Sequence, residues 1–598
     1  MRRFLTVTIF IVFAWLNFIV AYGNDPPPKK WKIASIRLEG ARFFSERRLR
    51  RTMVLRPSSI FSSRFYSSEL LDEDLTALEL FYRQRGYLEA EIVDRTVRFD
   101  STHHEVHITI NLSEGTRTFV EGVGIFGNRA FPDSLLLQKL QIQQENPFER
   151  RRIDASTLSL LTWYADHGFL EARVTPEIRT ESESHRAIVD FRVEEGMQFT
   201  VDDVRVVGLE KMRPYIVRRE LRFRTGDTVH YFRLLESQRQ LYLTGLFQSV
   251  YVRPQASARG DSTKKDVVVE VKENQSTEFN VSVGYGSVDK LRGKMEFFNM
   301  NIGGRGRRMG LAARVSFIRR GVEASFTDPW MLGTRWRMDL NVGTEYRNEP
   351  GYDFTQVGGL WTVGRYFLKR SKVTLTYRQQ HGKLGEVRVQ SLPDDVRTRI
   401  QSLRLTAVYD TRSNLFDATQ GFYFEWATEW GGSFSDNIRK FVRSTLQVRA
   451  FLSLDESTVL ASRLEAGLMN VQGGLPTVPL QERFYTGGPN SVRGFSYQKL
   501  GPLDENGVPT GGRFKIVWNL LEIRRTLHKM FGVVAFVDAG NIWSDPREFH
   551  FSSMRYSPGI GLRLITPIGT ARVDFGVNVD RRLDEPRYRW VLSMGQVF

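Results

Sequence analysis

The feature that most constrains this fold is a period-two alternation of apolar and polar residues across residues 277–598. Successive side chains point to opposite faces only in a β-strand, so this half of the chain is predicted to be all-β. In residues 334–346 aromatic and aliphatic side chains share one face, while charged and amide side chains share the other, and the same split recurs in residues 571–580. The apolar face of the first run carries Trp336, Met338, Leu340, Val342 and Tyr346.

Two all-β architectures produce this alternation. A soluble sandwich would turn its apolar faces inward, whereas a membrane barrel would turn them outward to lipid. Many runs reach about 9–11 residues, enough to cross a bilayer as a tilted strand. Aromatic residues recur near the run ends, and the turns divide the region into about 16 runs, an even number. We therefore predict an antiparallel transmembrane barrel over residues 275–598.

A long irregular segment, about residues 472–511, interrupts the strands. Loops of this length in compact folds are usually functional or disordered. The segment is rich in aromatic residues and places Arg493 between Val492 and Gly494, which is not the composition of a disordered tail. It is predicted either to fold back into a cavity, with Arg493 on a carboxylate, or to lie exposed on the surface.

The preceding region is a threefold repeat with a period of about 80 residues. Each copy opens on a strand that ends in a glycine and closes on an alternating strand. Between them, a second helix ends in a tyrosine followed by a glycine turn. The recurring tyrosines are Tyr82, Tyr164 and Tyr242, and the turn glycines are Gly86, Gly168 and Gly245. The order β-α-α-β-β predicts three small α+β domains, at residues 31–115, 116–196 and 197–274, since three unrelated segments would not share these markers in order.

The pattern of the N-terminal residues predicts that the chain is exported from the cytoplasm. Arg2 and Arg3 precede an apolar stretch at residues 4–20 and small residues at Ala21 and Gly23, a pattern typical of a secretory signal peptide over residues 1–23. An uncleaved transmembrane helix is the alternative. Residues 24–30, with three prolines, are predicted to be an extended leader.

Composition argues against several functional classes. The chain has no cysteine, which excludes disulfides and thiolate metal sites, and it has no HExxH, Walker or GxSxG motif. No metal, cofactor or enzymatic activity is therefore predicted. The net charge of +17 is dispersed among acidic residues, so we expect no nucleic-acid partner, while anionic lipid surfaces remain suitable.

Several motifs in the barrel region match one family in the right order. They are SFTDPWMLGT from Ser325, YDTRSNLFDATQG from Tyr409, GGPNSVRGF ending at Phe495, FVDAGNIW from Phe536 and SPGIGLRLITPIGTARVDFG from Ser557. With them the chain resembles the BamA/TamA family of outer-membrane assembly factors. These proteins combine periplasmic polypeptide-transport-associated (POTRA) domains with a 16-stranded barrel. Three repeats are more similar to the TamA branch, but the branch stays open.

The resemblance implies three functional elements. A VRGF loop, here Val492, Arg493, Gly494 and Phe495, folds into the lumen, where Arg493 pairs with Asp538 and Glu522. The last strand carries an insertion signal on Trp590, Leu592 and Phe598. The first and last strands meet at a lateral seam, where Gly284, Gly286 and Gly595 weaken the pairing, although such glycines also ease barrel curvature.

The implied function is insertion of β-barrel or autotransporter-type clients into the outer membrane of a Gram-negative-type bacterium, with the POTRA domains in the periplasm. The partners implied are unfolded client proteins, outer-membrane lipid and an accessory periplasmic or inner-membrane protein. Strand addition at POTRA edges and at the seam would supply the free energy. A two-partner-type secretion pore and a plain porin are the alternatives.

Overall fold

The computed structural model describes residues 31–58, 62–181, 183–367, 370–390, 396–432, 440–528, 530–566 and 569–594. The predicted signal peptide and leader lie outside these residues. Two compact units are present. The first comprises the chain up to Arg205 with Leu221–Gln238 and Val252–Val269, and the second comprises Val206–Glu220, Arg239–Tyr251 and Glu270–Phe598.

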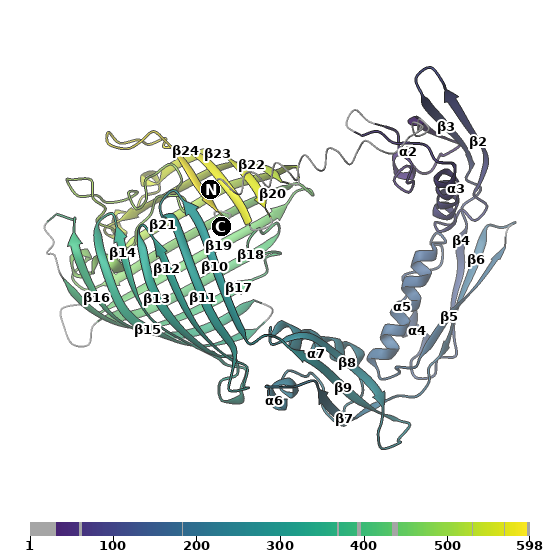
Figure 1. Ribbon diagram of the computed structural model, residues 1–598, viewed down its shortest axis with the longest axis horizontal. Helices are drawn as coiled ribbons and strands as arrows, with labels where there is room; N and C mark the ends of the chain where they lie inside the picture. The colour runs from purple at the N-terminus through teal and green to yellow at the C-terminus, as the bar shows by residue number, and fades with distance from the viewer. Residues whose placement is uncertain are drawn as a thin grey trace, which may run out of the picture. The chain divides into compact units, whose positions relative to one another are not determined.

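Each repeat folds into a three-stranded sheet whose last strand in sequence lies in the centre, with two helices alongside (Figure 1). The first and central strands run parallel in the first two repeats, which accounts for the helical crossover between them. The first repeat contains β1 (Lys32–Glu39), α2 (Glu46–Leu49), α3 (Ser68–Arg83), β2 (Glu91–Asp100) and β3 (Glu105–Ser113). The second contains β4 (Phe119–Phe126), α4 (Asp133–Leu137), α5 (Arg150–Asp166), β5 (Arg173–Glu181) and β6 (Arg186–Glu194). The third contains β7 (Thr200–Val207), α6 (Pro214–Arg218), α7 (Tyr231–Leu243), β8 (Phe247–Ala256) and β9 (Lys264–Glu273).

A glutamate at the end of each central strand explains part of the repeat pattern. Glu114, Glu195 and Glu273 accept backbone N–H groups from the loop that follows the first strand. The Tyr82 hydroxyl donates to Glu114 at 2.8 Å and the Tyr164 hydroxyl donates to Glu195 at 2.9 Å. Burial, together with these bonds, raises the pKa of both tyrosines, which keeps the hydroxyls protonated as donors.

The third repeat departs from the predicted equivalence of the three tyrosines. Tyr242 is 61% exposed, and Leu241 is fully buried in its place. The cause lies in the spacing, because Tyr242 stands three residues before Gly245, whereas Tyr82 and Tyr164 stand four before Gly86 and Gly168. One residue turns a helix by about 100°, so the tyrosine leaves the core.

The second half of the chain is one 16-stranded sheet in which each strand pairs antiparallel with the next (Figure 1). Both predictions of fold class, three α+β domains and a 16-stranded antiparallel barrel, are confirmed. The strands are β10 (Thr277–Gly286), β11 (Lys290–Ile302), β12 (Arg307–Ser316), β13 (Arg319–Asp328), β14 (Arg337–Glu349), β15 (Tyr352–Phe367), β16 (Ser371–Val387), β17 (Arg397–Asp410), β18 (Gly421–Gly432), β19 (Phe441–Ser453), β20 (Thr458–Val471), β21 (Phe514–His528), β22 (Phe531–Trp543), β23 (Arg555–Thr566), β24 (Gly569–Val577) and β25 (Tyr588–Met594). Short 3₁₀ turns lie at η1 (Met331–Gly333), η2 (Leu475–Thr477), η3 (Leu480–Glu482), η4 (Pro546–Glu548) and η5 (Phe551–Ser553).

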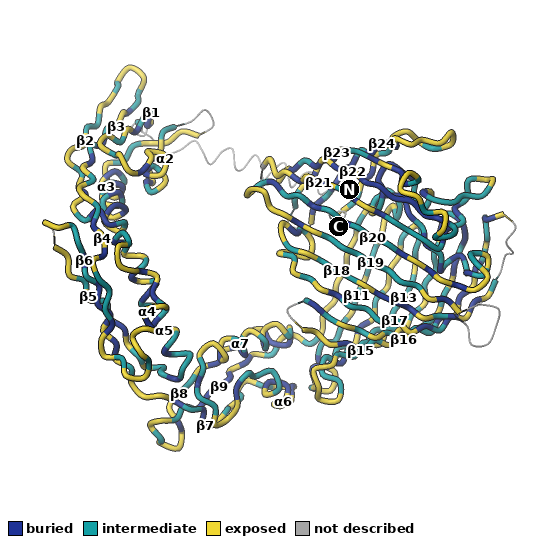
Figure 2. The backbone as a smooth tube through the Cα atoms, turned by 180° about the vertical axis from the view of Figure 1, so that it is seen from behind, coloured by how far each residue is buried: buried dark blue, intermediate teal, exposed yellow. Residues whose placement is uncertain are grey.

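Exposure alternates along many of the barrel strands, as the sequence predicts (Figure 2). In β14 the apolar residues Leu340 and Val342 are exposed, whereas Asp339 and Glu345 are partly buried. The apolar face therefore points outward, which is the arrangement of a membrane barrel and not of a soluble sandwich. Among the described helices, none is long and apolar enough to cross a membrane.

Candidate functional site

The long loop between β20 and β21 packs against the inner wall of the barrel. Val492, Phe495 and Leu500 from the loop form a buried cluster with Val517 of β21. Arg493, between them, is fully buried. Of the two arrangements left open by the sequence, the structure adopts the one in which the loop folds back.

Arg493 makes the most extensive set of contacts in the loop. Its Nε and Nη2 atoms donate to the two carboxylate oxygens of Asp538 at 2.7 and 2.8 Å, and its backbone N–H donates to the same group at 3.1 Å. Nη1 donates to Glu522 at 2.8 Å. The guanidinium carbon lies 3.3 Å from the ring centroid of Phe536, so the guanidinium group is stacked on this ring as well as hydrogen-bonded to the carboxylates. The structure thus brings three of the predicted site residues together.

Other charged groups surround this pair. Asp574 lies 3.7 Å from Arg493 and accepts from Arg563 at 2.6 Å, while Glu522 also accepts from Arg524 at 2.8 Å. Arg572 donates to the Pro489 carbonyl and the Asn490 side chain at 3.0 and 2.6 Å. The loop is therefore held by a buried network of ion pairs and hydrogen bonds from charged residues on β21 to β24. Asp574 was visible in the sequence only as one polar residue of an alternating run.

A local irregularity in β21 adds a further partner. Asn519 donates to Asp538 and to the Ser491 carbonyl, both at 2.8 Å. Strict alternation would put Asn519 and Glu522 on opposite faces. The register shifts between Asn519 and Leu521, and this bulge turns both side chains inward.

Glycine is required at position 494 because the loop backbone lies very close to the inner wall of the barrel there. The N–H of Gly494 donates to the Ser557 hydroxyl at 2.9 Å. A Cβ at Gly494 would lie 2.4 Å from that hydroxyl, and one at Gly576 would lie 2.9 Å from the Gly494 nitrogen. Neither position accepts a side chain unless the loop or the barrel wall shifts.

A second anchor, absent from the sequence predictions, lies at Glu482 where the loop enters the lumen. Arg378 of β16 donates to both Glu482 oxygens at 3.0 Å, and Arg443 of β19 lies 3.1 Å from the same carboxylate. Glu429 of β18 contacts both arginines from the other side, at 2.8 and 2.5 Å. Since Glu482 and Glu429 are each 3% exposed, the loop has one buried ionic anchor in its first third, at Glu482, and another at its middle, at Arg493.

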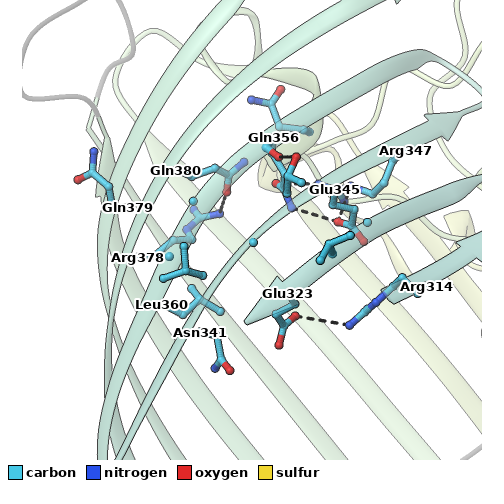
Figure 3. Close-up of a pocket in the computed structure, with 18 of the residues that line it drawn as sticks. Arg314, Glu323, Asn341, Glu345, Arg347, Gln356, Leu360, Arg378, Gln379 and Gln380 are labelled. Atoms are coloured by element: carbon cyan, nitrogen blue, oxygen red, sulfur yellow. Dashed lines mark hydrogen bonds and ion pairs between the residues drawn. The ribbon is translucent and has the colours of Figure 1, made fainter. Parts of the chain in front are cut away.

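A cavity of about 400 Å³ opens beside this anchor (Figure 3). Its wall carries paired polar side chains, with Arg314 facing Glu323 and Gln356 bonded to Glu345, between apolar residues such as Val342 and Leu360. The mixed charges are typical of a hydrated lumen and specify no ligand. Within the described residues, no cluster of His, Asp and Glu side chains is arranged to hold a metal ion.

Replacing Glu482 by glutamine is expected to release the first part of the loop while its middle stays bound through Arg493. Loss of charge-assisted hydrogen bonds of this kind costs about 1.5–3 kcal/mol of the free energy of unfolding. Heat-modifiability on gels would report the stability. Maleimide labelling of a Thr486→Cys reporter, buried in the parent, would report the release. Glu323→Gln is the matched control, because its partner Arg314 lies 3.5 Å away in a half-exposed pair. Equal stability and labelling in the two variants would contradict this anchor.

The two ends of the barrel sheet meet with little pairing. The Ser287 N–H donates to the Leu592 carbonyl at 3.0 Å, and over the described residues no strand register joins β10 to β25. By contrast, β25 pairs with β24 over seven residues and β10 with β11 over ten. Gly284 and Gly286 lie in β10, while Gly595 lies outside the described residues.

Two of the three residues of the predicted terminal signal lie within the described part of the chain. Trp590 and Leu592 of β25 are both exposed on the outer face, and the Trp590 ring lies 4.8 Å from that of Phe575. Phe598 lies outside the described residues. On the inner side, Arg589 donates to the Ser496 hydroxyl, so the loop also holds the last strand.

Two family models match the chain. The model described as "Omp85 superfamily domain" matches residues 301–598, and the POTRA model, described as "Surface antigen variable number repeat", matches residues 31–115, 118–196 and 199–274.

Similar proteins span most of the chain. "Outer membrane protein assembly factor BamA" of Nitratidesulfovibrio vulgaris is 25% identical over 96% of this chain and 74% of its own length. The protein of the same name from Neorickettsia risticii is 24% identical over 91% of this chain and 75% of its own length. Among solved structures, BamA from Haemophilus ducreyi lacking POTRA domains 1–3 is 19% identical, with a TM-score of 0.67 over 80% of this chain and all of that one. This likeness supports the fold.

Proposed function

This chain belongs to the Omp85 superfamily, and on that premise we propose that it inserts β-barrel or autotransporter-type client proteins into the outer membrane. It is an outer-membrane protein with three POTRA repeats in the periplasm. The observation that carries the proposal is the likeness, over 96% and 91% of the chain, to two proteins named as outer-membrane protein assembly factors.

The proposed mechanism is strand templating without enzymatic chemistry. Clients gain free energy by burying apolar strands in lipid and by pairing their backbone groups. Edges for such pairing exist at β2 and β5, each one of the two outer strands of its repeat sheet, and at β10 and β25 of the barrel. An accessory periplasmic protein would use the same kind of edge on the POTRA repeats.

The two loop anchors suit this role. A loop tied to β16 and β19 through Glu482, and to β21–β24 around its middle, spans the lumen between two walls. It would keep the interior from acting as an open pore and would support the wall next to the seam. Arg589 bonded to Ser496 extends that support to β25 itself.

Reconstitution of the purified protein into vesicles tests the function. We expect the protein to raise the rate at which an unfolded barrel client becomes protease-resistant and heat-modifiable, relative to empty vesicles. Planar-bilayer conductance should stay low, because the anchored loop occupies the lumen. Export of a soluble client without barrel insertion would instead indicate a two-partner-type secretion pore. Steady conductance without insertion would indicate a porin.

A further inference from the structure

Helix α7 of the third repeat exposes a stripe of large apolar side chains. Leu234 and Leu241 on its other face are buried, so the helix is already seated on its own sheet. The exposed side chains are Tyr231, Phe232, Leu235, Tyr242 and Leu243, with exposed fractions between 42% and 64%. At 3.6 residues per turn they fall on one continuous side of the helix. The longest helices of the other repeats expose one large apolar residue each, Leu80 on α3 and Leu158 on α5.

The stripe lies in the most basic part of its repeat. Residues 213–239 contain seven arginines and three acidic residues. Arg239 lies within the stripe, three and four residues from its apolar neighbours Tyr242, Leu235 and Leu243. The exposed arginines are Arg213, Arg218, Arg224, Arg233 and Arg239. An apolar helix face with exposed arginines is typical of helices that lie in the interface of an anionic membrane.

The chain itself holds the end of α7 close to the barrel rim. Asn274 donates its backbone N–H to the Leu246 carbonyl at 2.9 Å and its side-chain amide to the Gly245 carbonyl at 3.3 Å. Gly245 and Leu246 form the turn that ends the helix. Since β10 begins at Thr277, three Cα–Cα steps separate it from Asn274, and they reach at most about 10 Å. The last turn of α7 therefore lies near the level at which the first strand enters the bilayer.

We propose that α7 docks through this stripe on the periplasmic leaflet of the outer membrane, with its exposed arginines on anionic lipid headgroups. The apolar side chains would enter about 5–10 Å into the boundary between headgroups and acyl chains. The docking fixes the third repeat beside the seam, where a client strand would pass. This proposal rests on the place of the barrel in the outer membrane and not on its assembly activity.

The absence of native cysteine allows a direct test in the full-length protein. Leu235→Cys is labelled with an environment-sensitive fluorophore and reconstituted in phosphatidylethanolamine vesicles with or without phosphatidylglycerol, each doped with acyl-brominated lipid. Leu158→Cys on α5 is the matched control, an exposed leucine on the corresponding helix of the second repeat.

We expect bromine quenching at position 235 that exceeds quenching at 158, grows with phosphatidylglycerol and falls in high salt. Arg239→Gln should lower the ratio of docked to free helix about fivefold, the effect of one basic residue at an anionic surface. A heat-modifiable barrel in every variant verifies folding. Equal quenching at positions 235 and 158 in lipid alone would overturn the proposal. Shielding of position 235 only after addition of periplasmic protein would overturn it in favour of a protein partner.

Discussion

Replacing Arg493 by alanine is expected to destabilise the barrel by about 3–5 kcal/mol and to abolish client insertion. The loss is large because Asp538 and Glu522 are fully buried and would keep their charge without their main partner. Heat-modifiability and denaturant midpoints would measure the stability, and vesicle insertion would measure the activity. Arg314→Ala is the matched control, because it removes an arginine from a half-exposed pair with Glu323.

Further variants separate charge from geometry at this site. Arg493→Lys keeps the charge but loses the two parallel bonds to Asp538, so it should recover only part of the stability. Asp538→Ala should resemble Arg493→Ala, and the swap of Arg493→Asp with Asp538→Arg should restore part of what either change removes. Wild-type stability and activity in Arg493→Ala would refute a holding role for this residue.

The strands and helices could be predicted from the sequence because each depends on residues that are close together along the chain. Side chains in a strand alternate with period two, so the strands were visible from the positions of apolar residues alone. The repeat markers Gly86 and Gly168 likewise reflect local geometry, with positive φ at both turns. Tyr242 shows the limit of this reasoning, since one residue fewer before Gly245 moves it out of the core.

The functional site depends on contacts that no local pattern encodes. Glu482 meets Arg378 across 104 positions, and neither residue stands out among the other polar residues facing the lumen. The family resemblance points to Asp538 and Glu522, whereas alternation alone does not distinguish them from the other polar residues of their strands. Asn519 was hidden by a bulge, which breaks the period on which strand prediction relies.

Cross-linking the seam is expected to stop client insertion, and reduction is expected to restore it. Strands β10 and β25 can open only if few bonds join them, and the Ser287 to Leu592 bond is the backbone link between the described parts of these ends. Continuing that antiparallel register by two residues places Tyr285 opposite Met594. The double variant Tyr285→Cys with Met594→Cys should therefore oxidise to a disulfide, and vesicle insertion with and without reductant measures its effect.

The matched control joins two strands that already pair in full. Val281 of β10 lies opposite Met295 of β11, so a disulfide between cysteines at these positions adds a cross-link without closing the seam. This control should insert clients at the parent rate under oxidising conditions. A closed seam leaves both barrel edges paired, and a client strand then has no unpaired N–H and C=O groups to join in the membrane. If the Tyr285–Met594 disulfide forms and insertion continues at the parent rate, client strands do not pair with the barrel at the seam. The POTRA edges β2 and β5 would then be the strands that template the client.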